Sequence, residues 1–146
     1  MRSSTESKIY FFFQTQVNLQ QRTRLKKFLE SLFKREEKSL QSLNYIFCSD
    51  RQLLEINRQY LNHDFYTDII SFELSSKGAP VEGEIYISIE RVKDNALTIG
   101  ETLQRELLRV IFHGALHLCG YKDKTKEQIR KMREKEDFYI ALYSKA

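Results

Sequence analysis

The sequence FHGALHLCGYKDK, residues 112–124, places His113 and His117 four residues apart in an apolar run that stops at Gly120. On an α-helix, four residues advance by about 400°, so the two imidazoles lie within roughly 40° of each other and one turn apart. Glycine is the residue type that most often ends a helix. The stretch therefore predicts a helix that carries both imidazoles on one face and ends shortly after the second.

Two neutral imidazoles on adjacent helical turns form a preorganised pair of ligands for zinc or a similar divalent ion. Zinc in an enzyme usually takes three protein ligands and leaves the fourth position to water. Asp123 is the nearest candidate for the third ligand, because a chain that turns at Gly120 can fold back towards the open side of the pair. The residues thus predict a metal site of His113, His117 and Asp123.

An arbitrary HxxxH pair more often consists of ordinary helix residues satisfied by hydrogen bonds. Here two of the chain's three histidines lie in this one run, and the small Gly114 and Ala115 leave space beside the rings. The same two residues stand where the protease motif HExxH has its glutamate and a variable residue. The expected base of a metalloprotease is therefore absent.

The 146 residues are enough for one domain with a proper core, and we expect a single domain over residues 1–146. Apolar residues make up 41% of the chain and charged residues 30%, which excludes a disordered protein. Lys and Arg exceed Asp and Glu by 24 to 20, a net charge of +4, and the pI is near 9.0. This balance permits an anionic partner such as RNA without requiring one.

The chain shows no signal for export or for a membrane. Residues 1–8, MRSSTESK, have no apolar core after a basic start, and the following IYFFF is too short for a secretory or membrane segment. Cys48 and Cys119 lie in apolar segments, which favours reduced core thiols over a disulfide. We expect a cytoplasmic protein.

Alternating and aromatic apolar runs predict strands, and apolar residues at helical spacing predict helices. The expected strands are residues 9–17, 43–48, 69–74 and 84–89. The expected helices are 18–38, one through 53–61, one through 92–99, the motif helix from about residue 102, and one from residue 125 to the C-terminus. This order indicates an α/β (α+β) fold with a four-stranded mixed sheet packed against about five helices, and the metal site at the end of the motif helix.

HGALHLCGYKD, residues 113–123, closely resembles the signature HGxLHLxGYDH of the YbeY family of bacterial rRNA-maturation factors. Further pieces agree in order: LN at residues 61–62, TDIISF at 67–72 against the family's TDVLSF, and GEI at 83–85 against GDI. The resemblance implies a single-domain endoribonuclease that depends on one zinc ion per chain and is specific for single strands. It also implies a role in ribosomal RNA processing, notably at the 3′ end of the small-subunit RNA, and in ribosome quality control, with rRNA and the ribosome or its small subunit as partners.

The sequence departs from the family pattern at the third ligand. Family members bind the metal through three histidines, but the third position falls on Asp123, and Lys122 replaces the family's Asp. An Asp ligand adds a negative charge, which makes the bound water less acidic than an all-His set does. His63 is the rival third ligand, and we rank it second because it lies far off in sequence.

A second departure concerns RNA cleavage. The family usually carries an Arg between its LN and TD pieces, whereas HDFY at residues 63–66 has none. Lys122, Arg105 and Arg109 are the candidates to supply this positive charge and to contact RNA, and Lys122 is the one that we expect near the chemistry. No general acid is identifiable in the sequence.

Asp68 and Glu84 lie in the matching segments and could orient the ligand histidines or take part in catalysis. The alternatives are a turn bond for Asp68 and a solvent-facing strand position for Glu84. After the motif, basic residues from Lys124 to Arg133 alternate with acidic ones that include Glu136. That mixture is typical of a solvated helix face.

Two other functions stay open at this point. The chain could be a ribosome-associated RNA-binding factor with a structural metal and no cleavage, a reading that the missing Arg and the altered ligand favour. It could also be a metal-dependent hydrolase of another substrate. The natural metal and the oligomeric state do not follow from the sequence.

Overall fold

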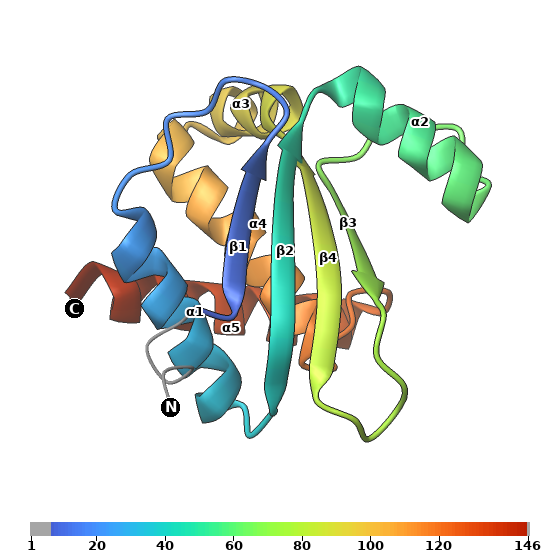
Figure 1. Ribbon diagram of the computed structural model, residues 1–146. Helices are drawn as coiled ribbons and strands as arrows, with labels where there is room; N and C mark the ends of the chain where they lie inside the picture. Colours follow the sequence, from blue (N-terminus) through green and yellow to red (C-terminus); the bar gives the residue numbers. More distant parts are fainter. Residues whose placement is uncertain (1–6, 146) are drawn as a thin grey trace.

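Four strands form one mixed sheet in the computed structural model, which describes residues 7–145 (Figure 1). The strands are β1 (Ile9–Phe13), β2 (Leu40–Cys48), β3 (Ile69–Glu73) and β4 (Val81–Ser88), and their order across the sheet is β1-β2-β4-β3. β1 pairs with β2 and β2 with β4 in parallel, whereas β3 runs antiparallel to β4. The predicted four-stranded mixed sheet is confirmed.

Five helices accompany the sheet: α1 (Arg22–Arg35), α2 (Asp50–Leu61), α3 (Ile89–Ile99), α4 (Leu103–Leu118) and α5 (Lys126–Lys145). The main core joins buried residues of α1, α4 and α5 to one face of β1, β2 and β4. A small second cluster, Cys48, Leu53 and Ile70, packs α2 against the other face. Figure 1 shows α4 and α5 running behind the strands and α2 lying apart from them at the upper right.

Several predicted boundaries were wrong: α1 spans Arg22–Arg35 instead of residues 18–38, β3 ends one residue early, and β2 and β4 each begin three residues before the predicted start. β1 ends at Phe13 rather than at residue 17, because its partner β2 ends at Cys48, one residue after the last pair, and the Gln14 amide makes the final bond, to the carbonyl oxygen of Phe47. Ile89 opens α3 instead of ending a strand, since the Ser88 hydroxyl accepts a hydrogen bond from the Arg91 amide and begins the helix there.

Along each strand, successive side chains point alternately to the two faces of the sheet. Tyr45, Phe47, Ile85 and Ile87 are fully buried in the main core. The hydroxyl of Tyr45 donates a 2.8 Å hydrogen bond to the carbonyl oxygen of Ile111, which ties the centre of β2 to the middle of α4. This buried bond fixes the helix that carries the two motif histidines.

α4 approaches the sheet closely beside the first motif histidine. A Cβ placed on Gly114 would lie 2.8 Å from Cδ1 of Ile85 and 2.9 Å from Cδ1 of Ile69, so a larger residue would push α4 away from β3 and β4. The helix begins after Thr102, whose hydroxyl accepts a hydrogen bond from the Arg105 amide, and ends at Leu118. Its C-terminal half is thereby held against the antiparallel end of the sheet.

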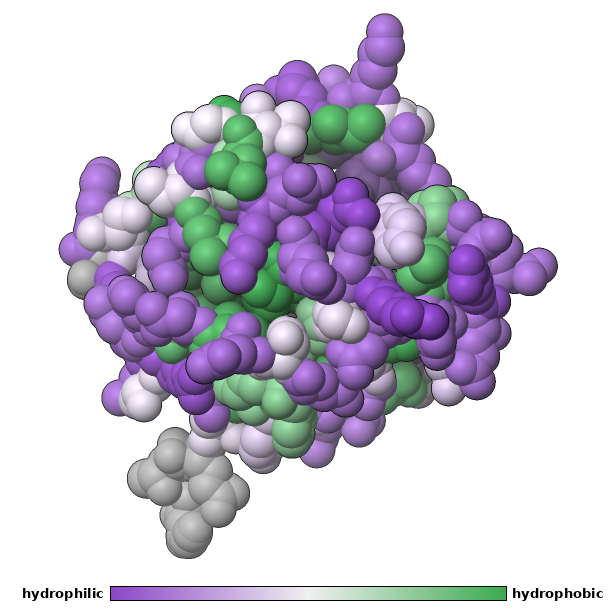
Figure 2. Space-filling view, turned by 90° about the horizontal axis from the view of Figure 1, so that it is seen from above, coloured by the Kyte–Doolittle hydropathy of each residue, from purple (hydrophilic) through white to green (hydrophobic). Residues whose placement is uncertain are grey.

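No helix in residues 7–145 combines the length and the apolar character that crossing a membrane requires. Seen from above, hydrophilic side chains dominate the surface, and hydrophobic ones gather in separate small patches (Figure 2).

Candidate metal centre

Three side chains converge at the C-terminal end of α4. The rings of His113 and His117 lie with their centroids 4.6 Å apart. The Nε2 atom of each ring is 3.2 Å from Oδ2 of Asp123. One ligand atom from each of the three residues lies within 4.8 Å of the others, so the group could hold a metal ion.

The other ring nitrogen of each histidine is held by an acceptor. Nδ1 of His117 donates to the carbonyl oxygen of Tyr121 at 2.9 Å, and Nδ1 of His113 contacts Oε2 of Glu136 at 2.6 Å. A carbonyl and a carboxylate can only accept, so both rings carry a proton on Nδ1, and a metal ion at the site would bind the two Nε2 atoms that face Asp123. This is the arrangement that a pair of zinc-binding histidines needs.

The chain that follows α4 delivers Asp123 to the two rings. Gly120 adopts a φ of +108°, a conformation that favours glycine, and its amide donates to the carbonyl oxygen of His117. The Tyr121 hydroxyl donates to Oε1 of Glu36 at 2.8 Å, which anchors the turn to the end of α1. Asp123 thus folds back over the histidines, as the glycine stop predicted.

Glu136 is the residue of this site that sequence reasoning missed. It comes from α5, is only 4% exposed, and also accepts a 3.0 Å hydrogen bond from Nη1 of Arg109. Burial lowers the pKa of His113, but the hydrogen bond and the charge of Glu136 outweigh burial, and the pKa is raised overall. The expected solvated helix face is therefore wrong at this position. Its spacing from the buried Met132 and Tyr139, four residues after one and three before the other, was the available signal.

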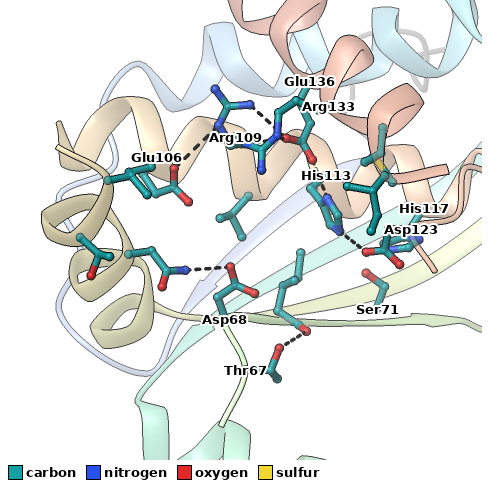
Figure 3. A pocket seen from close by; sticks show the side chains of 17 residues that line it. Thr67, Asp68, Ser71, Glu106, Arg109, His113, His117, Asp123, Arg133 and Glu136 are labelled. Atoms are coloured by element: carbon teal, nitrogen blue, oxygen red, sulfur yellow. Dashed lines mark hydrogen bonds and ion pairs between the residues drawn. The ribbon is translucent and has the colours of Figure 1, made fainter. Parts of the chain in front are cut away.

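A cavity of about 740 Å³ opens beside the candidate ligands, between α3, α4, α5 and the start of β3 (Figure 3). His113, His117 and Asp123 lie at one end. Glu106 lies at the other end, and Asp68, which accepts a hydrogen bond from the α3 residue Asn95, lies between the two ends. Burial raises the pKa of both carboxyl groups, Asp68 and Glu106.

The structure brings only one of the three predicted cations to this cavity. Arg109 lies in its wall, but its charge is engaged by Glu136 and by Asp137 at 2.9 Å. Lys122 is exposed and lines a separate hollow, and Arg105, which pairs with Glu101 at 3.2 Å, does not line the cavity.

Arg133 was included in the solvated face, yet it lines the cavity with a side chain that is 58% exposed. Its Nη1 atom lies 3.7 Å from Oε1 of Glu136, and the two residues form a salt bridge three positions apart on α5. Its exposed guanidinium is therefore the better placed group for contacting an anion in the cavity.

Asp68 and Glu84 have different surroundings. Oδ2 of Asp68 accepts a 3.1 Å hydrogen bond from Asn95, and the side chain lines the cavity without a direct hydrogen bond to either histidine. Glu84 lies outside the cavity lining and accepts a hydrogen bond from the Tyr86 hydroxyl at 3.1 Å. Its strand position points away from that of the buried Ile85, so it does not orient the histidines.

His63, the rival third ligand, is exposed and stacks on Phe65 with ring centroids 5.0 Å apart. It does not belong to the group of converging ligand atoms. Asp123 is therefore the third donor that the structure offers.

The chain matches one family model and several named relatives. A family model described as "Endoribonuclease YbeY" matches residues 11–144. A protein named Endoribonuclease YbeY from Cytophaga hutchinsonii is 50% identical over 138 residues, covering 94% of this chain and 96% of the relative. One of the same name from Flavobacterium psychrophilum is 46% identical over 135 residues, covering 92% and 96%. A Thermotoga maritima protein solved in solution matches with a TM-score of 0.62 at 29% identity, covering 92% of this chain and 88% of that one.

Proposed function

The chain belongs to the YbeY family of endoribonucleases, and from that premise we propose that it cleaves single-stranded RNA with a zinc ion held by His113, His117 and Asp123. Family membership makes the protein a hydrolase of RNA phosphodiester bonds. The finer proposal is a role in ribosomal RNA processing, at the 3′ end of the small-subunit RNA, and in ribosome quality control. The substrate would then be met on the ribosome or its small subunit, in the cytoplasm.

The geometry of the three donors carries the metal proposal. Both Nε2 atoms face Oδ2 of Asp123 at 3.2 Å, and both Nδ1 atoms are occupied by fixed acceptors. Three protein ligands that line an open cavity leave a position for water or substrate, as catalytic zinc sites do. When bound, the ion would supply Lewis-acid stabilisation to the phosphate and lower the pKa of water.

The side chains around the donors have separate tasks in this proposal. Glu136 and the carbonyl of Tyr121 hold the two imidazoles in one tautomer. Arg133 contacts a non-bridging phosphate oxygen and replaces the Arg that residues 63–66 lack. Asp68, whose pKa is raised by burial, is our candidate to protonate the leaving oxygen.

The cavity also supports single-strand specificity. Its volume of about 740 Å³ lies within the usual range of small-molecule sites, so it has room for an extruded nucleotide and not for a double helix. Unstacked nucleotides are available in single-stranded RNA, where their bases can be splayed out.

The test compares cleavage of one labelled RNA as a single strand and as a duplex, by protein stripped of metal and then given Zn²⁺, Mn²⁺ or Mg²⁺. Wild type should cut the single strand only when metal is restored, and zinc should work best. His113→Ala should lose metal and cleavage together, whereas the matched control His63→Ala should keep both. Full cleavage by His113→Ala would overturn the proposal.

A non-catalytic binding factor remains the second candidate, because no described residue of the segment 63–66 supplies the family's Arg. In that case the metal-restored protein would bind ribosomes and leave every RNA intact. The same cleavage assay, combined with sedimentation of the protein with small subunits, separates the two functions.

A further inference from the structure

Glu106 is a buried acid at the end of the cavity away from the candidate metal ligands. It is 6% exposed, and its buried Oε1 atom has no hydrogen-bond partner within residues 7–145. Its nearest cation is Nε of Arg109, 3.8 Å from Oε1, which is beyond hydrogen-bonding distance. A buried carboxylate costs free energy unless it is satisfied, so this group is available to a ligand that donates hydrogen bonds.

The free polar atoms at this end of the cavity are two acceptors and one donor, the donor being Nε of Arg109. Besides the Glu106 carboxylate, the Oδ1 atom of Asn95 receives no hydrogen bond from the described residues, because Asn95 uses its amide nitrogen on Asp68. The hydroxyls of Thr67 and Thr98 already donate hydrogen bonds to backbone carbonyl oxygens. The ligand chemistry that fits is therefore a group with adjacent N–H donors for Glu106 and an acceptor for Nε of Arg109, such as the N2 amine, N1–H and O6 of guanine.

Apolar side chains flank these acceptors. Ile69 from β3, Val110 from α4 and Ile99 from the end of α3 line the same cavity. Flat apolar walls with a few fixed polar atoms are the usual environment of a bound nucleobase.

The distance between Glu106 and His113 along α4 decides which part of a bound nucleotide can reach Glu106, the ribose or the base. Glu106 and His113 are seven residues apart, so they lie on the same side of the helix and about 10 Å apart along its axis. A ribose hydroxyl is only a few bonds from the phosphate, whereas the Watson–Crick edge of the base is the far end of the nucleotide. With its phosphate at the metal donors, a nucleotide places its base edge near Glu106.

We propose that Glu106 and Asn95 form a nucleobase subsite that selects guanine next to the scissile phosphate. The Watson–Crick edge of guanine presents two adjacent donors, N1–H and the N2 amine, which one carboxylate can accept side by side. Adenine presents one donor beside one acceptor, cytosine one donor beside two acceptors, and uracil one donor between two acceptors. This inference rests on the proposed function and adds its base preference.

The experiment uses metal-loaded wild type and a set of otherwise identical single-stranded RNAs with one guanosine, replaced in turn by inosine, adenosine, cytidine and uridine. Inosine lacks only the N2 amine. Wild type should cut beside guanosine at least about tenfold faster than beside inosine, the usual effect of one hydrogen bond to a charged group. Glu106→Gln should bring that ratio near one, and the control Glu101→Gln, outside the cavity, should leave it unchanged.

A binding measurement on the unaltered protein makes the result independent of whether the variant folds. Guanosine 5′-monophosphate should bind wild type more tightly than inosine 5′-monophosphate by a similar factor in calorimetric titration. Equal affinities together with equal cleavage beside both bases would refute the guanine subsite and leave the nuclease standing. Absence of cleavage with every RNA and metal would instead refute the proposed function.

Discussion

The two faces of the sheet differ in cover and in use. One face packs against α1, α4 and α5, and buries side chains such as Phe47 and Ile85 completely. On the other face the buried cluster involves α2 alone, and Tyr10 and Phe12 of β1 remain 45% and 48% exposed. The candidate metal donors lie on the first side. A site that must hold donor atoms to a fraction of an ångström belongs where several elements fix each side chain.

The largest effect should come from removing the contact that α5 makes with the ligand pair. Glu136→Gln keeps an acceptor but removes the charge beside His113. Metal affinity should fall about 10- to 100-fold, as is typical for groups that orient a ligand histidine. Competition with a zinc-binding dye measures it.

Glu134 on the same helix is exposed and lies outside the cavity lining, so Glu134→Gln is the matched control and should bind metal as wild type does. An unchanged affinity in Glu136→Gln would show that α5 covers the site without supporting it.

The next effect tests the close approach of α4 to the covered face. Gly114→Val should lower the free energy of unfolding by about 1–3 kcal/mol, because its side chain would meet Ile85 and Ile69 at a position where even a Cβ is crowded. Urea denaturation of the metal-free protein measures the change. Wild-type stability in this variant would mean that the helix and sheet are less tightly packed than described.

A smaller difference is expected between the reactivities of two thiols, Cys48 and Cys119, one on each side of the sheet. Burial raises the pKa of Cys48 to about 11 and that of Cys119 to about 12, so neither should react with a thiol reagent in the native protein at neutral pH. In mild denaturant Cys48 should react first, since α2 is its only helical cover. Mass spectrometry of the labelled peptides gives the order, and earlier labelling of Cys119 would reverse the comparison.

The smallest effect is expected on the face of the sheet whose buried cluster involves α2 alone. Glu84→Gln should change neither metal content nor cleavage, because Glu84 contacts Tyr86 and does not line the cavity. Asp68→Asn is the informative counterpart and should slow cleavage while metal content stays the same. A loss of metal in Glu84→Gln would contradict the assignment of the site to one side of the sheet.

The local part of the site could be predicted from the sequence. The shared face of His113 and His117 follows from helical geometry, and the return of Asp123 follows from the glycine stop. All three lie within one short stretch, so no knowledge of packing was needed to bring them together. That they bind a metal remains a prediction.

The supporting groups depend on tertiary packing, which a single sequence does not reveal. Glu136 reaches His113 only because α5 crosses α4, and its charged neighbours concealed a buried position. Glu84 and Ile85 are adjacent in sequence but lie on opposite faces, and the sequence match alone did not say which face carries the site. Lys122 sits next to Asp123 yet is directed to another hollow.

The most direct test of the metal centre is the metal content of protein purified without added metal, measured by mass spectrometry for wild type and Asp123→Ala in parallel. We expect one zinc per wild-type chain and loss of most of it in the variant, because two imidazoles alone make an incomplete site. Full zinc retention by Asp123→Ala, or no metal in wild type, would contradict a centre built from His113, His117 and Asp123.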